Sequence, residues 1–137
     1  MMKSRFTIFA VTVLLALAGA VLAADISQTK CPVSGMAINK ASSPHIDFQG
    51  QRIYFCSDSC PAAFKADPEK YFEKIAADKV VLENVQKICP VTGEQLDNKK
   101  SFTDYKGRRL YFCCDACKPN FAKDPVKYLN SMIEQPK

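Results

Sequence analysis

Apolar and polar residues alternate through residues 45–56, HIDFQGQRIYFC, on both sides of a glycine. A period of two is typical of half-buried β-strands, and a glycine between two such runs favours a tight turn. We therefore predict a β-hairpin with Gly50 at its bend. On the second strand, Tyr54 and Cys56 should share one face, whereas Phe55 lies on the other.

Two helical patterns follow this hairpin. In SDSCPAAFKA, residues 57–66, Ser57 or Asp58 is suited to cap a helix, and Pro61 is suited to its first turn. In DPEKYFEKI, residues 67–75, an aspartate again precedes a proline. This second pattern predicts another short helix, with the aspartate as its cap and the proline in the first position.

The whole pattern occurs a second time in the chain. Residues 31–75 begin with CPVSG and contain YFCSDSC, and residues 89–133 begin with CPVTG and contain YFCCDAC. A period of this length indicates repeated supersecondary units. We therefore predict an α+β protein made of two tandem units, each with a β-hairpin and short helices.

Residues 76–88, AADKVVLENVQKI, join the two units. Four apolar residues would form one stripe if this segment were helical: Val81, Leu82, Val85 and Ile88. The pattern therefore predicts a helical linker.

Residues 1–23 have a different character. Lys3 and Arg5 precede a mostly apolar run, and a small residue, Ala23, stands at the predicted cleavage point. This order is typical of a secretory signal peptide. The run is slightly shorter than the about 20 residues of a membrane-spanning helix. We predict a secreted or periplasmic protein, in contact with a membrane only through this segment if it is not cleaved.

The charges of the chain are mixed. The 19 Lys and Arg and the 14 Asp and Glu give a formal net charge of +5, and basic residues form only short pairs. We therefore expect solvated faces and no nucleic-acid partner. Because units of about 45 residues have marginal apolar cores, we expect the units to pack together or to be stapled.

All seven cysteines follow the predicted signal peptide. An odd number cannot be fully paired within one chain. Cys56 ends a predicted strand, Cys60 enters a first helical turn where a thiolate is favoured, and Cys31 can fold over to join them. The second unit repeats the set with Cys89, Cys113 and Cys117. Three converging thiolates suit a soft ion such as Cu(I) or Zn(II).

A closed structural zinc site would need a fourth protein ligand, usually a cysteine three positions after the first. This chain has Ser34 and Thr92 at those positions. Both predicted sites are therefore three-coordinate, or open at one position. An open thiolate site suits capture and transfer of an ion better than permanent binding.

Three further residues are candidate ligands. Met36 and His45 are near the first site in sequence. A lone Met more often fills a core, and a lone His on a strand is more often a surface or packed residue. Cys114 should point away from Cys113 if the strand continues. Cys114 is a spare ligand, a dimer-forming thiol or a small apolar residue.

Two other uses of the cysteines stay open. Cys56 with Cys60, and Cys113 with Cys117, could close disulfides in an oxidising compartment. Zinc or disulfides would then staple a structural or protein-interaction module. A redox protein is the third alternative, although this spacing differs from that of thioredoxin-like motifs. The sequence has no Ser/His/Asp set and no phosphate loop, so we predict that the protein is not an enzyme.

Both units resemble the YHS domain, which belongs to the wider TRASH metal-binding group. The resemblance rests on Cys-Pro-Val-x-Gly, Tyr-Phe-Cys-x3-Cys and Asp-Pro-x-x-Tyr, which recur in order in both copies. It implies treble-clef-like units, and it implies six cysteines as metal ligands: Cys31, Cys56, Cys60, Cys89, Cys113 and Cys117. Many members carry a further cysteine where this chain has Ser34 and Thr92.

The resemblance also implies a role in heavy-metal trafficking, resistance or sensing. Together with the open thiolate sites, it leads us to expect an exported protein that holds or transfers Cu(I) or a similar ion. A metal efflux system or a cuproprotein would be its partner.

Overall fold

The computed structural model describes residues 25–133 of the chain, and the predicted signal peptide lies outside this range. Across the described range, none of the helices combines the length and the apolar character needed to cross a membrane.

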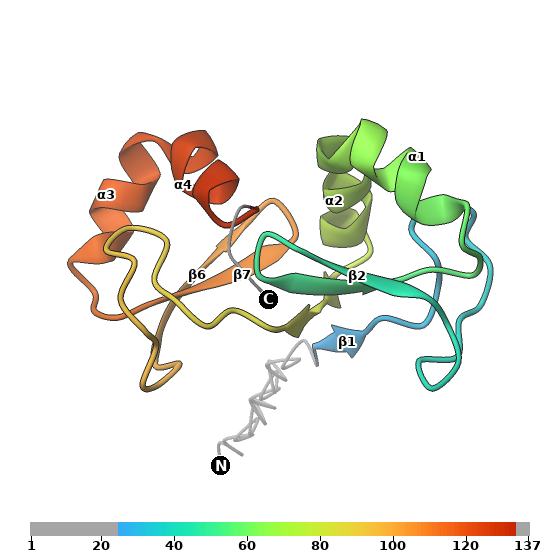
Figure 1. Cartoon of the computed structure of the whole chain (residues 1–137), viewed down its shortest axis with the longest axis horizontal. Coiled ribbons are helices and arrows are strands. Elements are labelled where there is room, and N and C mark those ends of the chain that lie inside the picture. Colours follow the sequence, from blue (N-terminus) through green and yellow to red (C-terminus); the bar gives the residue numbers. More distant parts are fainter. Residues whose placement is uncertain (1–24, 134–137) are drawn as a thin grey trace, which may run out of the picture.

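Two similar α+β units lie side by side, and each has a pair of short helices above a β-hairpin (Figure 1). The first contains β2 (His45–Phe48), β3 (Gln51–Tyr54), α1 (Cys60–Ala66) and α2 (Pro68–Ala77). The second contains β6 (Ser101–Tyr105), β7 (Arg108–Phe112), α3 (Cys117–Lys123) and α4 (Pro125–Ser131). Both hairpins are antiparallel. The predicted α+β fold with two similar units is confirmed.

The aspartate–proline pairs begin the second helix of each unit, as predicted. Asp67 accepts a hydrogen bond from the backbone N–H of Lys70, and Asp124 accepts one from that of Lys127. The predicted capping of α1 is wrong, since its N-cap residue is Ser59 and makes no side-chain cap bond. The hydroxyls ahead of this helix bond to each other and to a thiol instead.

The connection between the units is extended rather than helical. After α2 ends, β4 (Val80–Val81) pairs in parallel with β1 (Ile26–Ser27), and β5 (Glu83–Asn84) pairs with β3. The prediction of a helical linker over residues 76–88 is therefore wrong beyond the end of α2. The β-branched residues of β4 suit a strand, and β1 and β3 provide edges that the local pattern does not reveal.

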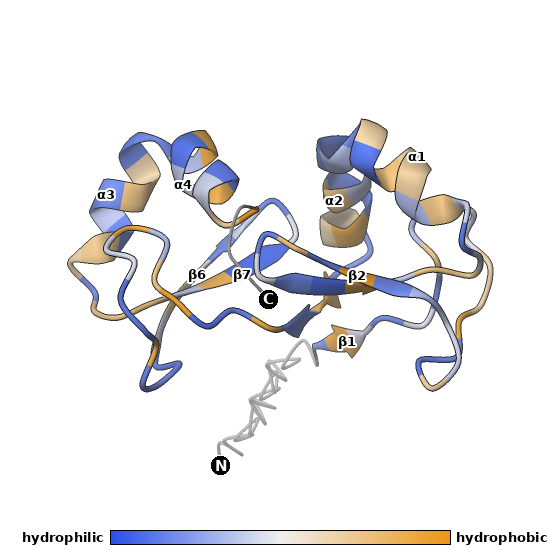
Figure 2. Cartoon of the chain, in the orientation of Figure 1, coloured by the Kyte–Doolittle hydropathy of each residue, from blue (hydrophilic) through white to orange (hydrophobic). Residues whose placement is uncertain are grey.

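Each unit has its own aromatic core. The Phe64 ring lies 5.7 Å from that of Phe55 and 5.3 Å from that of Phe72 in the first unit. Phe112 and Phe121 are 5.6 Å apart in the second. Two cysteines of each unit belong to the same buried clusters. The helices carry hydrophobic residues on only part of their surface, as expected for helices that cover a core on one side (Figure 2).

The turn of each hairpin packs against the other unit. A Cβ atom added at Gly50 would lie 2.7 Å from the Cε atom of Met132, in the second unit. A Cβ atom added at Gly107 would overlap with the backbone carbonyl oxygen of Phe72, in α2 of the first unit. The two small units therefore pack directly together.

A buried arginine completes this contact. Arg108, 1% exposed, donates hydrogen bonds to Gln49 at 2.6 Å and to Glu69, both in the first unit. Its guanidinium carbon lies 3.6 Å from the centroid of the Phe72 ring, which is cation–π geometry.

Candidate metal centres

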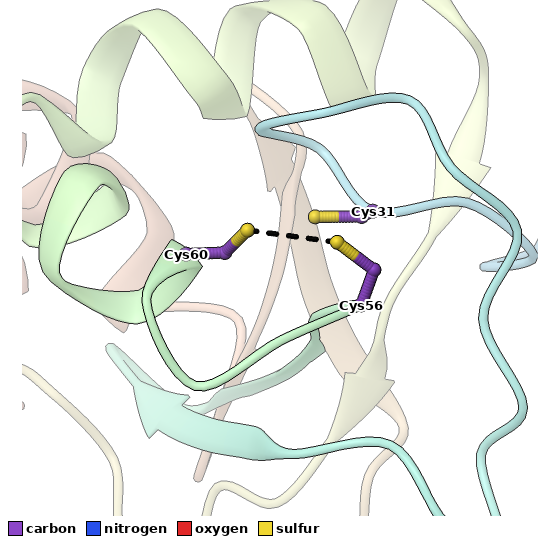
Figure 3. A group of neighbouring side chains, drawn as sticks. All are labelled: Cys31, Cys56 and Cys60. Atoms are coloured by element: carbon purple, nitrogen blue, oxygen red, sulfur yellow. Dashed lines mark hydrogen bonds between the residues drawn. The ribbon is translucent and has the colours of Figure 1, made fainter.

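Three thiols converge in each unit. The Sγ atoms of Cys31, Cys56 and Cys60 all lie within 4.8 Å of one another, and they point toward a common centre (Figure 3). The Sγ atoms of Cys56 and Cys60 are 3.6 Å apart. The second unit repeats this cluster, within the same limit, with Cys89, Cys113 and Cys117. The predicted convergence of three sulfurs in each unit is confirmed.

A closed turn holds the first cysteine of each triad. In the first unit, the backbone N–H of Gly35 donates to the carbonyl of Cys31 at 2.8 Å, and Gly35 has a φ of +76°. In the second unit, Gly93 donates to Cys89 at 2.9 Å with a φ of +75°. Glycine adopts this left-handed conformation without strain. The Cys-Pro-Val-x-Gly sequence is therefore the turn that presents the opening thiol.

A buried glutamine ties this turn to the strand that carries the second cysteine. The Gln28 amide donates to the carbonyls of Tyr54, at 2.8 Å, and Lys30, at 3.0 Å, and accepts from the Tyr54 N–H at 3.1 Å. Because Tyr54 stands two positions before Cys56, Gln28 fixes the segment before Cys31 relative to Cys56.

The second unit contains the same set of hydrogen bonds, made by Gln86. We call this set the glutamine bracket of each unit. Gln86 donates to the carbonyls of Tyr111, at 2.6 Å, and Ile88, at 2.9 Å, and accepts from the Tyr111 N–H at 2.9 Å. Neither glutamine was predicted to contribute to a site, because each predicted repeat begins at its opening cysteine. The available signal was a glutamine three positions before Cys31 and Cys89.

Hydroxyl groups face the sulfurs at the positions predicted to lack a fourth cysteine. The Ser34 Oγ lies 3.1 Å from the Cys56 Sγ, and the Thr92 Oγ1 lies 3.5 Å from the Cys113 Sγ. Both positions are therefore directed at the cluster. A sulfur there would reach the triad, but this chain has a harder oxygen donor instead.

Met36 and His45 are the other two candidate ligands near the first site in sequence. The Met36 side chain is 63% exposed, so it is not core filler, and its role as a ligand stays a prediction. His45 packs its ring 5.3 Å from that of Tyr54. His45 is not part of the group whose ligand atoms all lie within 4.8 Å of one another.

Cys114 turns toward the second cluster. Its Sγ lies 3.9 Å from that of Cys113 and 3.7 Å from that of Cys117. The predicted orientation away from Cys113 depended on a continuing strand, but β7 ends at Phe112 and a bend follows. Ser57 takes the place of Cys114 in the first unit.

The opening cysteine of each triad has a lowered pKa. Burial opposes ionisation of Cys31, but hydrogen bonds from backbone groups, including Ser34 and Cys56, and from the Ser34 hydroxyl outweigh it. The pKa of Cys31 falls from 9.0 to about 7. The same balance, with Thr92 in the place of Ser34, lowers the pKa of Cys89 to about 7.

The cysteines at the helix starts behave in the opposite way. The Ser57 hydroxyl favours the thiolate of Cys60, but burial and the neighbouring sulfurs outweigh it and raise the pKa of Cys60. Burial, followed by the neighbouring thiols, raises the pKa of Cys117. The expectation of a favoured thiolate at Cys60 is therefore wrong. A bound cation would displace the protons that these thiols retain.

The donor set and its spacing fit a soft metal ion. Thiolates bound to one ion at about 2.3 Å lie about 3.8 Å from each other when the coordination is tetrahedral. The 3.6 Å separations of Cys56 from Cys60 and of Cys113 from Cys117 are close to that value. One pair of sulfurs in each triad is therefore already spaced like two ligands of one ion, and the third sulfur lies within 4.8 Å of both.

Two segments of the chain, residues 29–74 and 88–132, match the YHS domain family. The chain belongs to this family. No curated protein and no solved structure gave a match. Each YHS segment contains one complete cysteine triad, whereas Gln28 and Gln86 lie just before the matched residues.

Proposed function

We propose that this YHS protein is exported and holds Cu(I), or a similar soft heavy-metal ion, in one three-sulfur site per unit for transfer to a partner. The observation that carries the proposal is the hydroxyl that faces each triad: Ser34 near Cys56, and Thr92 near Cys113. An ion held by three sulfurs keeps one side open to an incoming soft ligand.

The exposure of the triads supports transfer. Cys31 and Cys60 are buried, whereas Cys56 is partly exposed, and the second triad has the same arrangement. A partner can therefore approach each site along the edge marked by Cys56 or Cys113. We propose a metal efflux system or a cuproprotein as this partner. The signal-peptide pattern of residues 1–23 supports a secreted or periplasmic location.

One observation favours a second candidate function. Two cysteines of each triad are members of the buried apolar clusters, so a bound zinc ion would act as a structural staple in a protein-interaction module. The contact between the units argues against a need for such a staple, because it adds a buried arginine and two packed turns to the small cores.

Metal analysis of anaerobically purified mature protein tests the proposal. We expect one Cu(I) per unit, removable by a soft chelator without unfolding. Cys60→Ser and Cys117→Ser should each remove one ion and leave the other. Tightly held zinc whose removal unfolds the chain would contradict the proposal and support the structural alternative.

A cysteine in place of Ser34 or Thr92 would give the triad beside it a fourth sulfur ligand. We expect Ser34→Cys and Thr92→Cys to slow release of Cu(I) from their own sites at least about tenfold, equivalent to about 1.4 kcal/mol. Ser34→Ala is the matched control, since it removes the hydroxyl without adding a ligand, and it should not slow release. Equal rates in Ser34→Cys and Ser34→Ala would show that this position is not open to a ligand.

A further inference from the structure

The second unit contains two triangles of sulfur that share an edge. Cys113 and Cys117 form the shared edge, 3.6 Å long. Cys89, which is completely buried, is the third corner of one triangle, and the exposed Cys114 is the third corner of the other. The first unit has only one such triangle, because Ser57 stands in the place of Cys114.

We propose that Cys114 is the exchange ligand through which a metal ion leaves the second site, an inference that rests on the proposed function. The ion first binds Cys89, Cys113 and Cys117. Its bond to the Cys89 sulfur is then replaced by a bond to the Cys114 sulfur, so that it lies in the exposed triangle. The ion keeps its oxidation state, while Cys114 releases a proton and Cys89 takes one up.

The distances support this exchange. The sulfur–sulfur separations in the exposed triangle are 3.6, 3.7 and 3.9 Å, which bracket the about 3.8 Å expected for thiolates on one ion. Cys114 is outside the group whose ligand atoms all lie within 4.8 Å of one another. It therefore succeeds Cys89 as a ligand and does not act beside it.

The bend that carries Cys114 is held in place. The Asp115 carboxylate accepts a hydrogen bond from the Ser101 hydroxyl at 2.7 Å and pairs with Lys118 at 2.7 Å. Ser101 begins β6 and Lys118 is in α3, so the bend is tied to both elements. Cys114 is thereby presented next to the shared edge.

The first unit offers a matched comparison. The Ser57 Oγ lies 3.3 Å from the Cys60 Sγ and 3.9 Å from the Cys56 Sγ. These contacts resemble those of Cys114, but the hydroxyl is a hard donor with low affinity for Cu(I). The first site should therefore release its ion more slowly than the second.

The test follows transfer of Cu(I) from the loaded mature protein to a soft bidentate chelator, by rapid mixing without oxygen. We expect a fast phase from the second unit and a slow phase from the first. Cys114→Ser should slow the fast phase about tenfold, with one ion per unit still bound. Ser57→Cys, the reciprocal variant, should accelerate the slow phase by a similar factor.

Each other outcome overturns the inference. If Cys114→Ser and Ser57→Cys leave both phases unchanged while both sites still bind Cu(I), the exchange role is wrong and the proposed function stands. If Cys114→Ser loses one bound ion while its circular dichroism is unchanged, Cys114 is a resident ligand rather than an exchange ligand. If the unaltered protein binds no Cu(I), the proposed function fails, and the inference fails with it.

Discussion

The two units differ most where they meet. At equivalent positions after the hairpin glycines, the first unit buries Gln51 and the second buries Arg108. The Gln51 amide donates to the backbone carbonyl of Arg109 at 2.8 Å, whereas Arg108 reaches Gln49 and Glu69. A charged guanidinium group therefore reaches from the second unit to the first, and a neutral amide reaches from the first unit to the second. The two copies of one fold therefore meet through different side chains at equivalent positions, Gln51 in the first unit and Arg108 in the second.

The same units agree closely where they present sulfur. Both have the glycine turn, the glutamine bracket and the hydroxyl beside the triad. Next to the cysteine that begins the first helix, the second unit has Cys114 where the first has Ser57. The two units therefore share the turn and the hydrogen bonds that position the cysteines, and they differ in the side chains at the surfaces around them. Substitutions in the shared scaffold should therefore act alike in the two units, and substitutions in the divergent surfaces should act differently.

The largest effect should come from the interface. Gly107→Ala adds a Cβ atom that overlaps with the backbone of Phe72, and it strains a residue with a φ of +76°. We expect a loss of about 4 kcal/mol in the free energy of unfolding, because left-handed strain costs about 1–2 kcal/mol and overpacking about 1–3 kcal/mol. Urea unfolding of the reduced protein measures this loss.

Gly93→Ala is the control, since its φ is +75° and nothing lies within 4 Å of the added Cβ atom. This variant should lose only about 1–2 kcal/mol. Equal losses in the two variants would mean that the turn at Gly107 does not pack against the first unit in solution.

The glutamine brackets should give a smaller effect that is equal in the two units. Gln28→Leu and Gln86→Leu each remove three hydrogen bonds and leave buried backbone groups unpaired. We expect each to lower the free energy of unfolding by about 2 kcal/mol and to weaken metal binding mainly in its own unit. Titration with Cu(I) and urea unfolding measure the two effects.

The exposed Gln95 provides the control for this pair. Gln95→Leu should leave stability within about 0.5 kcal/mol of the unaltered protein. If the effect of Gln28→Leu or Gln86→Leu is no larger than that of Gln95→Leu, the brackets do not hold the turns.

The smallest effect should be a difference in thiolate content near neutral pH. Cys31 and Cys89, with pKa values of about 7, should ionise alike in the reduced, metal-free protein. Hydrogen bonds from the thiols of Cys117 and Cys113 lower the pKa of Cys114. Because the first unit has Ser57 in its place, the second unit should contain more thiolate once Cys114 ionises. Ultraviolet absorbance of the thiolates during a pH titration measures this content.

Cys31→Ser should remove the first unit's ionisation near pH 7 and leave that of the second. Because the pKa values of Cys31 and Cys89 are lower in the folded chain than the ordinary 9.0, their ionisation should stabilise the fold increasingly from pH 7 to 9. This contribution is lost as the pH falls through about 7. The same titration curve in the folded and the urea-unfolded protein would contradict the lowered pKa values.

Most of the predictions that succeeded concern contacts set by short stretches of chain. The convergence of Cys31 with Cys56 and Cys60 is the exception, since it joins segments that are distant in the sequence. Cys56 and Cys60 are separated by one bend, so a strand that ends before a helix brings their sulfurs together. The Asp67 cap is likewise a contact with a residue three positions later. The orientation of Cys114 could not be predicted, because it depends on the residue at which β7 ends. The linker was mistaken for a helix because its pairing strands are far away in sequence.

The sequence by itself determined the repeat and the hairpin and helices of each unit, because these depend on residue spacing and local turn chemistry. It also indicated which three thiols belong to each site, because both copies of the repeat contain the same three cysteines. Only the tertiary structure decided that the pKa values of Cys31 and Cys89 are lowered, where Cys114 points and how the units meet. Those features depend on burial and on hydrogen bonds from segments distant in the chain. The residue pattern of one segment does not indicate which distant segments contact it in the folded chain.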